Sequence, residues 1–463
     1  MLESAARLFS RSQVPARVSA IDTRVLGRIV PGAEEEERLR AAIRAAIDAV
    51  AAECARRGLA AQPLLVGSVA KGTHLTNTEI DLFVAFPPET SRDTLEREGL
   101  ALGSLLEKPV RMYAEHPYTR GWFRGFEMEI VPCFRITEAT QRMSAVDRTP
   151  LHADYVLGRL KEGQANEVRL LKAWTEGVGV YGAEAKVRGF SGYLCELLVL
   201  AHGTFRGVLE ASLGWKPGVV VELERKATRP FPEPLVVVDP IDGSRNVASA
   251  VSVEQLATFV HAARQYLRRP SERFFFPRPS RPRGVADLRR SLRSRGTELL
   301  AVSIPAPALT EDIVYPQLRK ALHAIEELFH RHGFATLATR FELAADEAVF
   351  LFEFEVFRLP RVALHDGPPA FVKNSEEFLR KWSRSKRRIA GPFLRGDRWL
   401  VQVRREAPDA AQVLRENLQT LSLGKDLDRV AKRARVLVGT DAVRKQYAAT
   451  LTRFWDARFP WER

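Results

Sequence analysis

The stretch LLVGSVAKGTHLTNTEIDLFVAF, residues 64–86, places two acids inside an apolar run. It begins apolar, breaks at Gly67–Ser68, passes through small and polar residues, and then sets Glu79 and Asp81 among large apolar side chains. Side chains at positions i and i+2 of a strand share one face, about 6.5 to 7 Å apart. We therefore expect Glu79 and Asp81 to project together, where two carboxylates can bind a hard cation such as Mg²⁺.

A second apolar stretch, FEMEIVPCF at 126–134, supplies further acids. Glu127 and Glu129 share one strand face, and Glu129 lies deeper in the apolar run. Two divalent ions can clamp the attacking and leaving oxygens of a phosphoryl transfer, which calls for a third acid. Glu129 is the candidate, whereas Glu127 is expected to be solvated or to support the site from behind.

Gly67 and Ser68 open a turn whose backbone N–H groups, followed by Lys71, are suited to cradle a triphosphate. The segment GSVAKGT does not match the Walker pattern of P-loop proteins. For an isolated Glu-x-Asp, a half-exposed edge strand with solvated acids is the common alternative. The Gly-Ser turn, the apolar flanks and the third acid together favour an active site.

The composition is that of a folded globular protein with a polyanionic partner. The chain has 463 residues, 45% of them hydrophobic, and carries 71 Lys and Arg against 57 Asp and Glu, a formal charge of +14. This excess favours nucleic acid, with an anionic membrane surface second. Three scattered cysteines, Cys54, Cys133 and Cys195, fit a reducing cytoplasm, and no segment is apolar and long enough to span a membrane.

The order of the patterns predicts an α+β multidomain protein. A helix at 33–57, the two apolar runs within 64–86, and short apolar runs at 110–116 and 126–134 are expected to form a catalytic domain at 1–140. Helical periodicity then dominates a central domain at 141–272, with helices in NEVRLLKAWTEGVGV, FSGYLCELLVLAHGTF and VEQLATFVHAARQYLRR.

The stretch 270–284 holds four prolines and four arginines and marks a boundary. Beyond it, strand-like runs such as TELLAVSIPAP and RWLVQVRRE, interrupted by a helix at QLRKALHAIEELFHRHG, predict an α+β C-terminal domain at 273–463.

These motifs resemble a known family. GSVAKGTHLTNTEIDLFVAF is similar to the Gly-Ser and paired-acid signature of the nucleotidyltransferase superfamily that includes DNA polymerase β, and in detail to the archaeal, class I CCA-adding enzymes. The resemblance continues in family order through YAEHPY, EIVPCF, SAVDRTPLH, NEVRLLKAW, VYGAEAKVRGFSGYLCELL, VVDP-ID-x-x-RNVA, YPQL and LFEFEV. It covers nearly the whole chain, and VYGAEAKVRGFSGYLCELL is its most specific segment.

The resemblance implies roles for individual residues. It makes Glu79, Asp81 and Glu129 the catalytic acids and the Mg²⁺ ligands, and Arg245 the reader of the base of CTP or ATP. The nucleotide contacts that it implies are Ser68, Lys71, His152, Lys172 and Tyr181.

Two positions depart from the family, which usually has Asp at 129 and Arg at 71. Glu129 adds a methylene at a metal ligand, and Lys71 replaces a bidentate fork with a point charge. Both departures preserve charge, so activity is expected to survive.

Two further motifs need separate interpretation. DPIDGS at 239–244 is similar to a metal motif of inositol monophosphatases, but the upstream acids of those enzymes are arranged differently. Asp239 and Asp242 are instead expected to shape the turn that presents Arg245 and Asn246. RKWSRSKRR at 380–388 has six basic residues and one Trp, which suits RNA phosphates and a stacking ring or, alternatively, a solvated charged face.

The resemblance implies a template-independent tRNA nucleotidyltransferase that adds C, C and A to the tRNA 3′ end from CTP and ATP. It would contact the acceptor stem and elbow of tRNA, use Mg²⁺, and work in the cytoplasm without a membrane partner; a homodimer is left open. The alternatives are a poly(A) or oligoadenylate polymerase and an RNA-binding homologue whose catalysis has lapsed.

Overall fold

The computed structural model describes residues 19–113, 117–344 and 346–463. It divides into two compact units, one formed by the chain up to Pro279 together with Phe459–Arg463, the other by Ser280–Arg458. Residues 114–116 of the predicted strand at 110–116 lie outside the described residues. The division into three domains at 140 and 272 stays a prediction, and the mixed α+β architecture is confirmed.

The first unit begins with two helices, α1 (Ala20–Ile29) and α2 (Ala33–Arg56). The acids in the first turn of α2 and the arginine in its last turn complement the helix dipole. Its buried face carries apolar side chains from Leu39 to Cys54, which confirms the helix predicted at 33–57.

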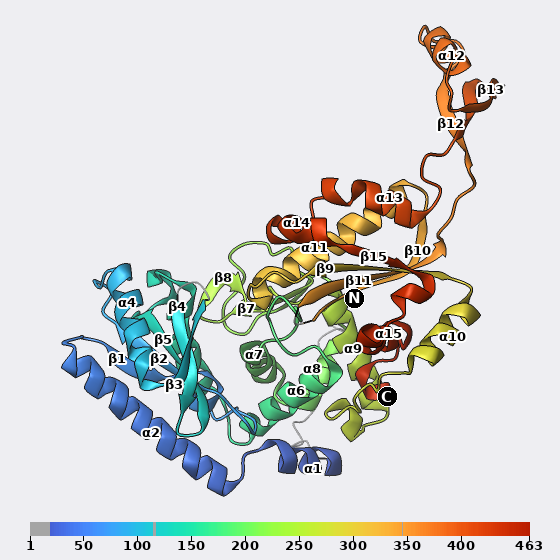
Figure 1. Ribbon diagram of the computed structural model, residues 1–463. Coiled ribbons are helices and arrows are strands. Elements are labelled where there is room, and N and C mark those ends of the chain that lie inside the picture. Colours follow the sequence, from blue (N-terminus) through green and yellow to red (C-terminus); the bar gives the residue numbers. More distant parts are fainter. Residues whose placement is uncertain (1–18, 114–116, 345) are drawn as a thin grey trace, which may run out of the picture. The chain divides into compact units, whose positions relative to one another are not determined.

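A five-stranded sheet follows, in the order β1-β2-β5-β4-β3. Its strands are β1 (Gln62–Leu65), β2 (Ile80–Phe86), β3 (Glu107–Tyr113), β4 (Pro117–Phe123) and β5 (Phe126–Phe134). Only the central pair, β2 and β5, is parallel. Helices α2 and α4 (Arg92–Leu102) contact strands of this sheet (Figure 1).

The two faces of this sheet bury different side chains. On β2, Ile80, Leu82 and Val84 pack into the core shared with α2, while Phe83 and Ala85 face a smaller cluster on the other side. This alternation puts Asp81 on the face opposite the main core.

The rest of the first unit is mostly helical, as expected from its periodicity. Its helices are α5 (Thr149–Leu157), α6 (Gln164–Val178), α7 (Gly192–His202), α8 (Phe205–Ser212) and α9 (Val253–Arg268). They enclose an aromatic core in which Trp174 lies 5.1 Å from Phe259, centroid to centroid. The helical patterns did not predict a small sheet formed by β6 (Val219–Val221), β7 (Leu235–Asp239) and β8 (Asp242–Asn246).

The final residues 459–463 belong to this first unit. The ring of Trp461 stacks on Phe274 at 5.4 Å and on Phe459 at 4.7 Å, and its Nε1 donates to Gln265 Oε1 at 2.7 Å. The chain therefore leaves this unit after Pro279 and returns to it.

The second unit is built on an antiparallel sheet in the order β10-β11-β9-β15. Its strands are β9 (Glu298–Pro305), β10 (Ala335–Leu343), β11 (Glu347–Val356) and β15 (Arg435–Val438). One face packs on α11 (Glu311–Arg331), with α13 (Ala410–Asn417) and α14 (Lys425–Val430), and the other packs on α10 (Val285–Arg295) and α15 (Ala448–Trp455). Residue 345, between β10 and β11, lies outside the described residues.

A separate three-stranded sheet in this unit, ordered β12-β14-β13, corrects one expectation. Its elements are β12 (Val362–Pro369), β13 (Arg388–Arg395) and β14 (Arg398–Arg404), covered by α12 (Ser375–Ser383). Trp382 of α12 is only 7% exposed and packs on Val401 and Val403, so it cannot serve as a free stacking ring. The six basic residues of 380–388 are all exposed.

Across the described ranges, none of the helices is both long and apolar enough to cross a membrane.

Candidate active site

The turn predicted at Gly67–Ser68 is a single-turn helix, α3 (Gly67–Ala70), between β1 and β2. Gly67 has a φ of +69°, and a Cβ at this position would lie 1.8 Å from Asp81 Oδ2. The backbone N–H of Val66 donates to the carbonyl of Asp81 at 3.0 Å. Because no side chain fits between α3 and the Asp81 carboxylate, glycine is required here.

The structure places Asp81 directly beside Glu129. The two residues are paired in register on the parallel strands β2 and β5. Because paired residues of neighbouring strands point to the same face, their side chains leave the sheet together. Glu79 differs from expectation, since β2 begins at Ile80 and Glu79 lies just before it, in an exposed position.

The charges of these acids influence one another. Burial, and after it the negative charges of Glu129 and Glu79, raise the pKa of Asp81 from its ordinary value to about 7, although Lys71 and Lys172 oppose the rise. Glu79 is exposed as a residue, but partial desolvation of its carboxylate raises its pKa; Arg120 opposes this rise and Glu129 adds to it. The protein thus holds negative charges near one another, an arrangement that a bound cation would relieve.

The carboxylate of Glu129 is engaged by Arg120. This arginine is paired with Glu129 in the antiparallel register of β4 and β5, and donates to Glu129 Oε1 from Nε at 2.8 Å and from Nη2 at 2.6 Å. Glu127, which we expected to be solvated or supporting, lies 3.7 Å from the same arginine.

The donor type of the three acids fits a hard divalent cation, because all their side-chain ligands are oxygens. As the side chains lie, however, the described part of the chain contains no group of three or more His, Cys, Asp or Glu side chains arranged to hold a metal ion. The acids are neighbours, but Glu129 bonds to Arg120 rather than turning toward a shared centre.

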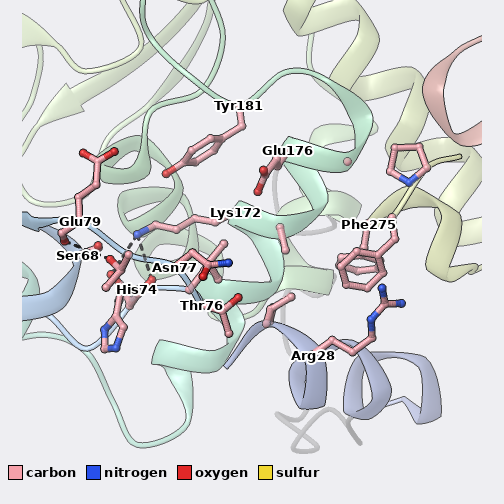
Figure 2. A pocket seen from close by; sticks show the side chains of 18 of the residues that line it. Arg28, Ser68, His74, Thr76, Asn77, Glu79, Lys172, Glu176, Tyr181 and Phe275 are labelled. Atoms are coloured by element: carbon pink, nitrogen blue, oxygen red, sulfur yellow. Dashed lines mark hydrogen bonds between the residues drawn. The ribbon is translucent and has the colours of Figure 1, made fainter. Parts of the chain in front are cut away.

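A cavity of about 890 Å³ lies beside the acids. Figure 2 shows Ser68, Glu79, Lys172 and Tyr181 around it. With Asp81, these make five of the nine predicted site residues in one lining. The volume falls within the range of about 300–1,000 Å³ that is usual for small-ligand sites.

Lys71 and Lys172 meet at a carboxylate that the sequence motifs did not indicate. Glu196 of α7 is fully buried, and its Oε2 accepts from Lys71 Nζ at 2.6 Å. Its Oε1 accepts from Thr73 Oγ1 at 2.6 Å and from Lys172 Nζ at 3.3 Å. Burial alone would raise the pKa of Glu196, but Lys172 and Lys71 reverse the effect and hold it below its ordinary value.

His152 and Arg245 meet at a second buried carboxylate, Asp239. Its Oδ2 lies 3.0 Å from His152 Nε2 and accepts from Arg245 Nη1 at 2.8 Å. Burial opposes ionisation, yet His152 and Arg245 bring the pKa of Asp239 down to about 2. Burial lowers the pKa of His152, although Asp239 partly offsets this.

Tyr193 connects the lysines that bond to Glu196 with the group formed by Asp239, His152 and Arg245. Its ring stacks on His152 at 4.2 Å, its hydroxyl donates to Asp239 Oδ1 at 3.4 Å, and Lys71 Nζ lies 5.7 Å from the ring centroid. Four predicted residues lie outside the cavity lining: Lys71, Glu129, His152 and Arg245. Glu129 is paired with Asp81, which lines the cavity, and Lys71 lies over the ring of Tyr193. His152 and Arg245 share the carboxylate of Asp239.

The turn at 239–244 has the structure expected of it. Asp239 Oδ1 accepts from the backbone N–H of Ile241 at 3.1 Å, and Asp242 Oδ1 accepts from that of Ser244 at 3.1 Å. Asn246 is buried, and its Oδ1 accepts from the N–H groups of Val237 and Ala248 at 2.9 Å each. Asn246 therefore fixes the strand connection.

Three contributors escaped sequence reasoning: Thr73, Arg120 and Glu196. Glu196 offered a signal, because a charged residue within the apolar helix pattern of CELLVL is unusual unless it is paired. Arg120 offered none, since its role depends on the pairing of β4 with β5.

Comparisons with known proteins agree along the chain. The model of the nucleotidyltransferase domain matches residues 47–152, that of the tRNA nucleotidyltransferase second domain matches 166–276, and that of the CCA-adding enzyme C-terminal domain matches 295–439.

Whole-chain relatives carry the same name. The CCA-adding enzyme of Methanoregula boonei is 37% identical, covering 94% of this chain and 95% of its own length. That of Methanosarcina barkeri is 38% identical over 87% of this chain and 90% of its own length. That of Halorubrum lacusprofundi is 38% identical over 92% and 95%. With this identity over most of its length, and with all three domain models matched in order, the chain belongs to the CCA-adding enzyme family.

Proposed function

We propose that this protein completes the 3′ end of tRNA by adding C, C and A from CTP and ATP, releasing pyrophosphate at each step. The observation that carries the proposal is the pairing of Asp81 with Glu129 on parallel strands, next to a cavity of nucleotide size that Lys172 lines. Family membership indicates that the substrate is tRNA, and these residues indicate the chemistry of nucleotide addition.

Glu79, Asp81 and Glu129 are the proposed holders of Mg²⁺. Their oxygen donors suit this ion, and the raised pKa of Asp81 reflects burial together with neighbouring negative charge, both of which a bound cation would offset. When bound, Mg²⁺ lowers the pKa of the attacking hydroxyl and offsets the charge on the triphosphate. To hold the ion, Glu129 would give up its hydrogen bonds with Arg120.

The other residues bind and orient the substrates. Ser68 and Lys172 in the cavity wall, with Lys71 beside them, hold the triphosphate, and Tyr181 packs against the nucleotide. Arg245 donates to the edge of the base, positioned by Asp239, and His152 supports the same group. Without a nucleic-acid template, base choice depends on these protein groups together with the tRNA end.

The second unit is the proposed grip on the acceptor stem and elbow of tRNA. Its exposed basic residues at 380–388 suit contacts to phosphates, so affinity should fall as salt rises. A cytoplasmic protein that handles tRNA needs no membrane partner, and a homodimer stays an untested prediction.

The experiment is an incorporation assay with purified protein, Mg²⁺, and labelled CTP or ATP. Three tRNAs are compared, ending before CCA, after the first C, and after CC. We expect CTP to be used on the first two and ATP on the third. Tailing with ATP alone on every tRNA would support a poly(A) polymerase instead, and tRNA binding without incorporation would support a lapsed homologue.

A further inference from the structure

Glu196 is a charged residue in an apolar setting. It lies in the middle of α7, where its neighbours Leu194, Cys195, Leu197 and Leu198 are all fully buried. A buried ion pair stabilises a fold poorly, and apolar residues of similar volume often do as well or better. The fold alone therefore gives little reason for a carboxylate at this position.

The contacts of Glu196 join segments that are distant in the sequence. Lys71 and Thr73 follow α3, whose Ser68 lines the cavity, and Lys172 lies on α6. Both oxygens of Glu196 are used, Oε2 by Lys71 and Oε1 by Thr73 and Lys172. One carboxylate thus fixes the position of two ammonium groups.

The two lysines differ in the donors that they have left. Lys172 Nζ has three acceptors, namely Thr73 O at 3.2 Å, Thr73 Oγ1 at 3.1 Å and Glu196 Oε1, which match its three N–H groups. Within the described residues, the hydrogen-bond acceptor of Lys71 Nζ is Glu196 Oε2. Two N–H groups of Lys71 therefore stay available to a phosphate.

The first turn of α7 shapes the same corner. A Cβ on Gly192 would lie 3.2 Å from the Tyr181 hydroxyl and 3.4 Å from Cε of Lys172. The helix that carries Glu196 therefore also makes room for two cavity residues, which ties its position to the nucleotide site.

We propose that Glu196 is a positioning residue for the triphosphate: it holds Lys71 with two donors directed to phosphate oxygens and fixes Lys172 in the cavity wall. This inference rests on the proposed function, since it assumes that the cavity binds a nucleoside triphosphate. Without Glu196, two buried ammonium groups would lose the carboxylate that accepts a hydrogen bond from each of them, and they would repel each other. Lys71 would then lose the geometry in which its remaining N–H groups meet the phosphates, and Lys172 would lose its fixed place in the cavity wall.

The test uses Glu196→Gln, which keeps the size of the side chain and removes its charge. Isothermal titration of the full chain measures the affinity for CTP, ATP and inorganic tripolyphosphate, and steady-state assays give KM and kcat. We expect all three ligands to bind about tenfold more weakly, because a charge-assisted contact is misplaced. The KM rises in parallel, kcat changes by less than about threefold, and the preference between CTP and ATP is unchanged.

A double-mutant cycle with Lys71→Met tests whether Glu196 acts through that lysine. We expect Glu196→Gln to have little further effect on tripolyphosphate affinity once Lys71 is replaced. Fully additive effects would overturn the proposal, as would a Glu196→Gln variant that binds tripolyphosphate like the wild type.

Glu353→Gln is the matched control. Glu353 is 1% exposed on β11 of the second unit, and accepts from Arg295, Thr297 and Trp455. Its replacement should lower the melting temperature about as much as Glu196→Gln does, without changing nucleotide affinity. If both variants weaken tripolyphosphate binding equally, the effect is one of stability and the proposal is wrong.

A second variant covers the case in which Glu196→Gln does not fold, and the titrations cover the case in which the wild type is inactive. If Glu196→Gln does not fold, Thr73→Val removes one of the contacts to Glu196 and should shift the affinity in the same direction by a smaller factor. If the wild type incorporates neither CTP nor ATP, the proposed function fails. The tripolyphosphate titrations still decide the role of Glu196 in that case.

Discussion

Two carboxylates of the first unit, Asp81 and Glu196, lie in surroundings of opposite sign. Burial and the charges of Glu129 and Glu79 raise the pKa of Asp81 to about 7, and the opposing effect of Lys71 and Lys172 is smaller. Glu196 is bonded to Lys71 and held near Lys172, and its pKa is lowered although it is fully buried. The first cluster has an excess of negative charge and the second an excess of positive charge, so they suit a cation and a phosphate respectively.

The comparison shows that burial alone does not determine the charge of a side chain. Both carboxylates lose water, which by itself would raise both pKa values. The difference comes from the neighbouring elements: β5 brings Glu129 to Asp81, whereas α3 and α6 bring lysines to Glu196. Two regions of opposite sign beside one cavity are what transfer of a metal-bound triphosphate requires.

The largest expected effect comes from removing one charge from the acidic cluster around Asp81. Asp81→Asn removes the charge with almost no change in shape, and we expect incorporation of CTP and ATP to fall about 1,000-fold or more. Single-turnover incorporation measures the loss, and Glu79→Ala should behave in the same way. Glu127→Gln is the control, because Glu127 faces Arg120 on the same sheet. Full activity in Asp81→Asn would remove the metal assignment.

A smaller effect tests the contact between α3 and the acid. Gly67→Ala puts a Cβ where Asp81 Oδ2 lies and forces a residue with a side chain into a positive φ. Displacing a reacting group by about 1 Å can cost about 100-fold in rate, and we expect a loss of that order. Gly58→Ala, also at positive φ but with open space around it, controls for backbone strain. Equal losses in both variants would contradict the contact.

The smallest effect concerns stability against pH without metal. The folded pKa of Asp81 is raised, so its ionisation costs stability, and the cost grows as pH rises from about 4 to about 7 and is constant above. In EDTA, the melting temperature of Asp81→Asn should rise by a few degrees relative to that of the wild type as the pH increases from about 4 to about 7. For Glu196 the sign is reversed, and its stabilising contribution is lost as pH falls through its lowered pKa. A constant difference between Asp81→Asn and wild type would show that Asp81 is not perturbed.

Much of the acidic region could be predicted from the sequence, because the alternation of IDLFVAF and EIVPCF specifies which side chains leave the sheet together. The strand start could not, since the polar residues before Ile80 give no boundary signal. That is why Glu79 was expected inside the strand.

The positive region was harder to predict, for physical reasons. Lys71 and Lys172 were identified individually through the family resemblance, but their common partner Glu196 depends on how α3, α6 and α7 pack. Trp382 shows the same limit, because its charged neighbours suggested an exposed ring while the packing of α12 buries it. Local pattern reports the face of an element, and only tertiary packing decides which faces meet.

The return of residues 459–463 to the first unit has a consequence for folding. The stack of Trp461 on Phe274 joins residues that are separated by more than 180 positions in the sequence, and these positions include the whole second unit. During synthesis, the first unit therefore cannot complete its aromatic core until the second unit has been synthesised. The second unit is inserted rather than appended, and it is tethered by two peptide links instead of one.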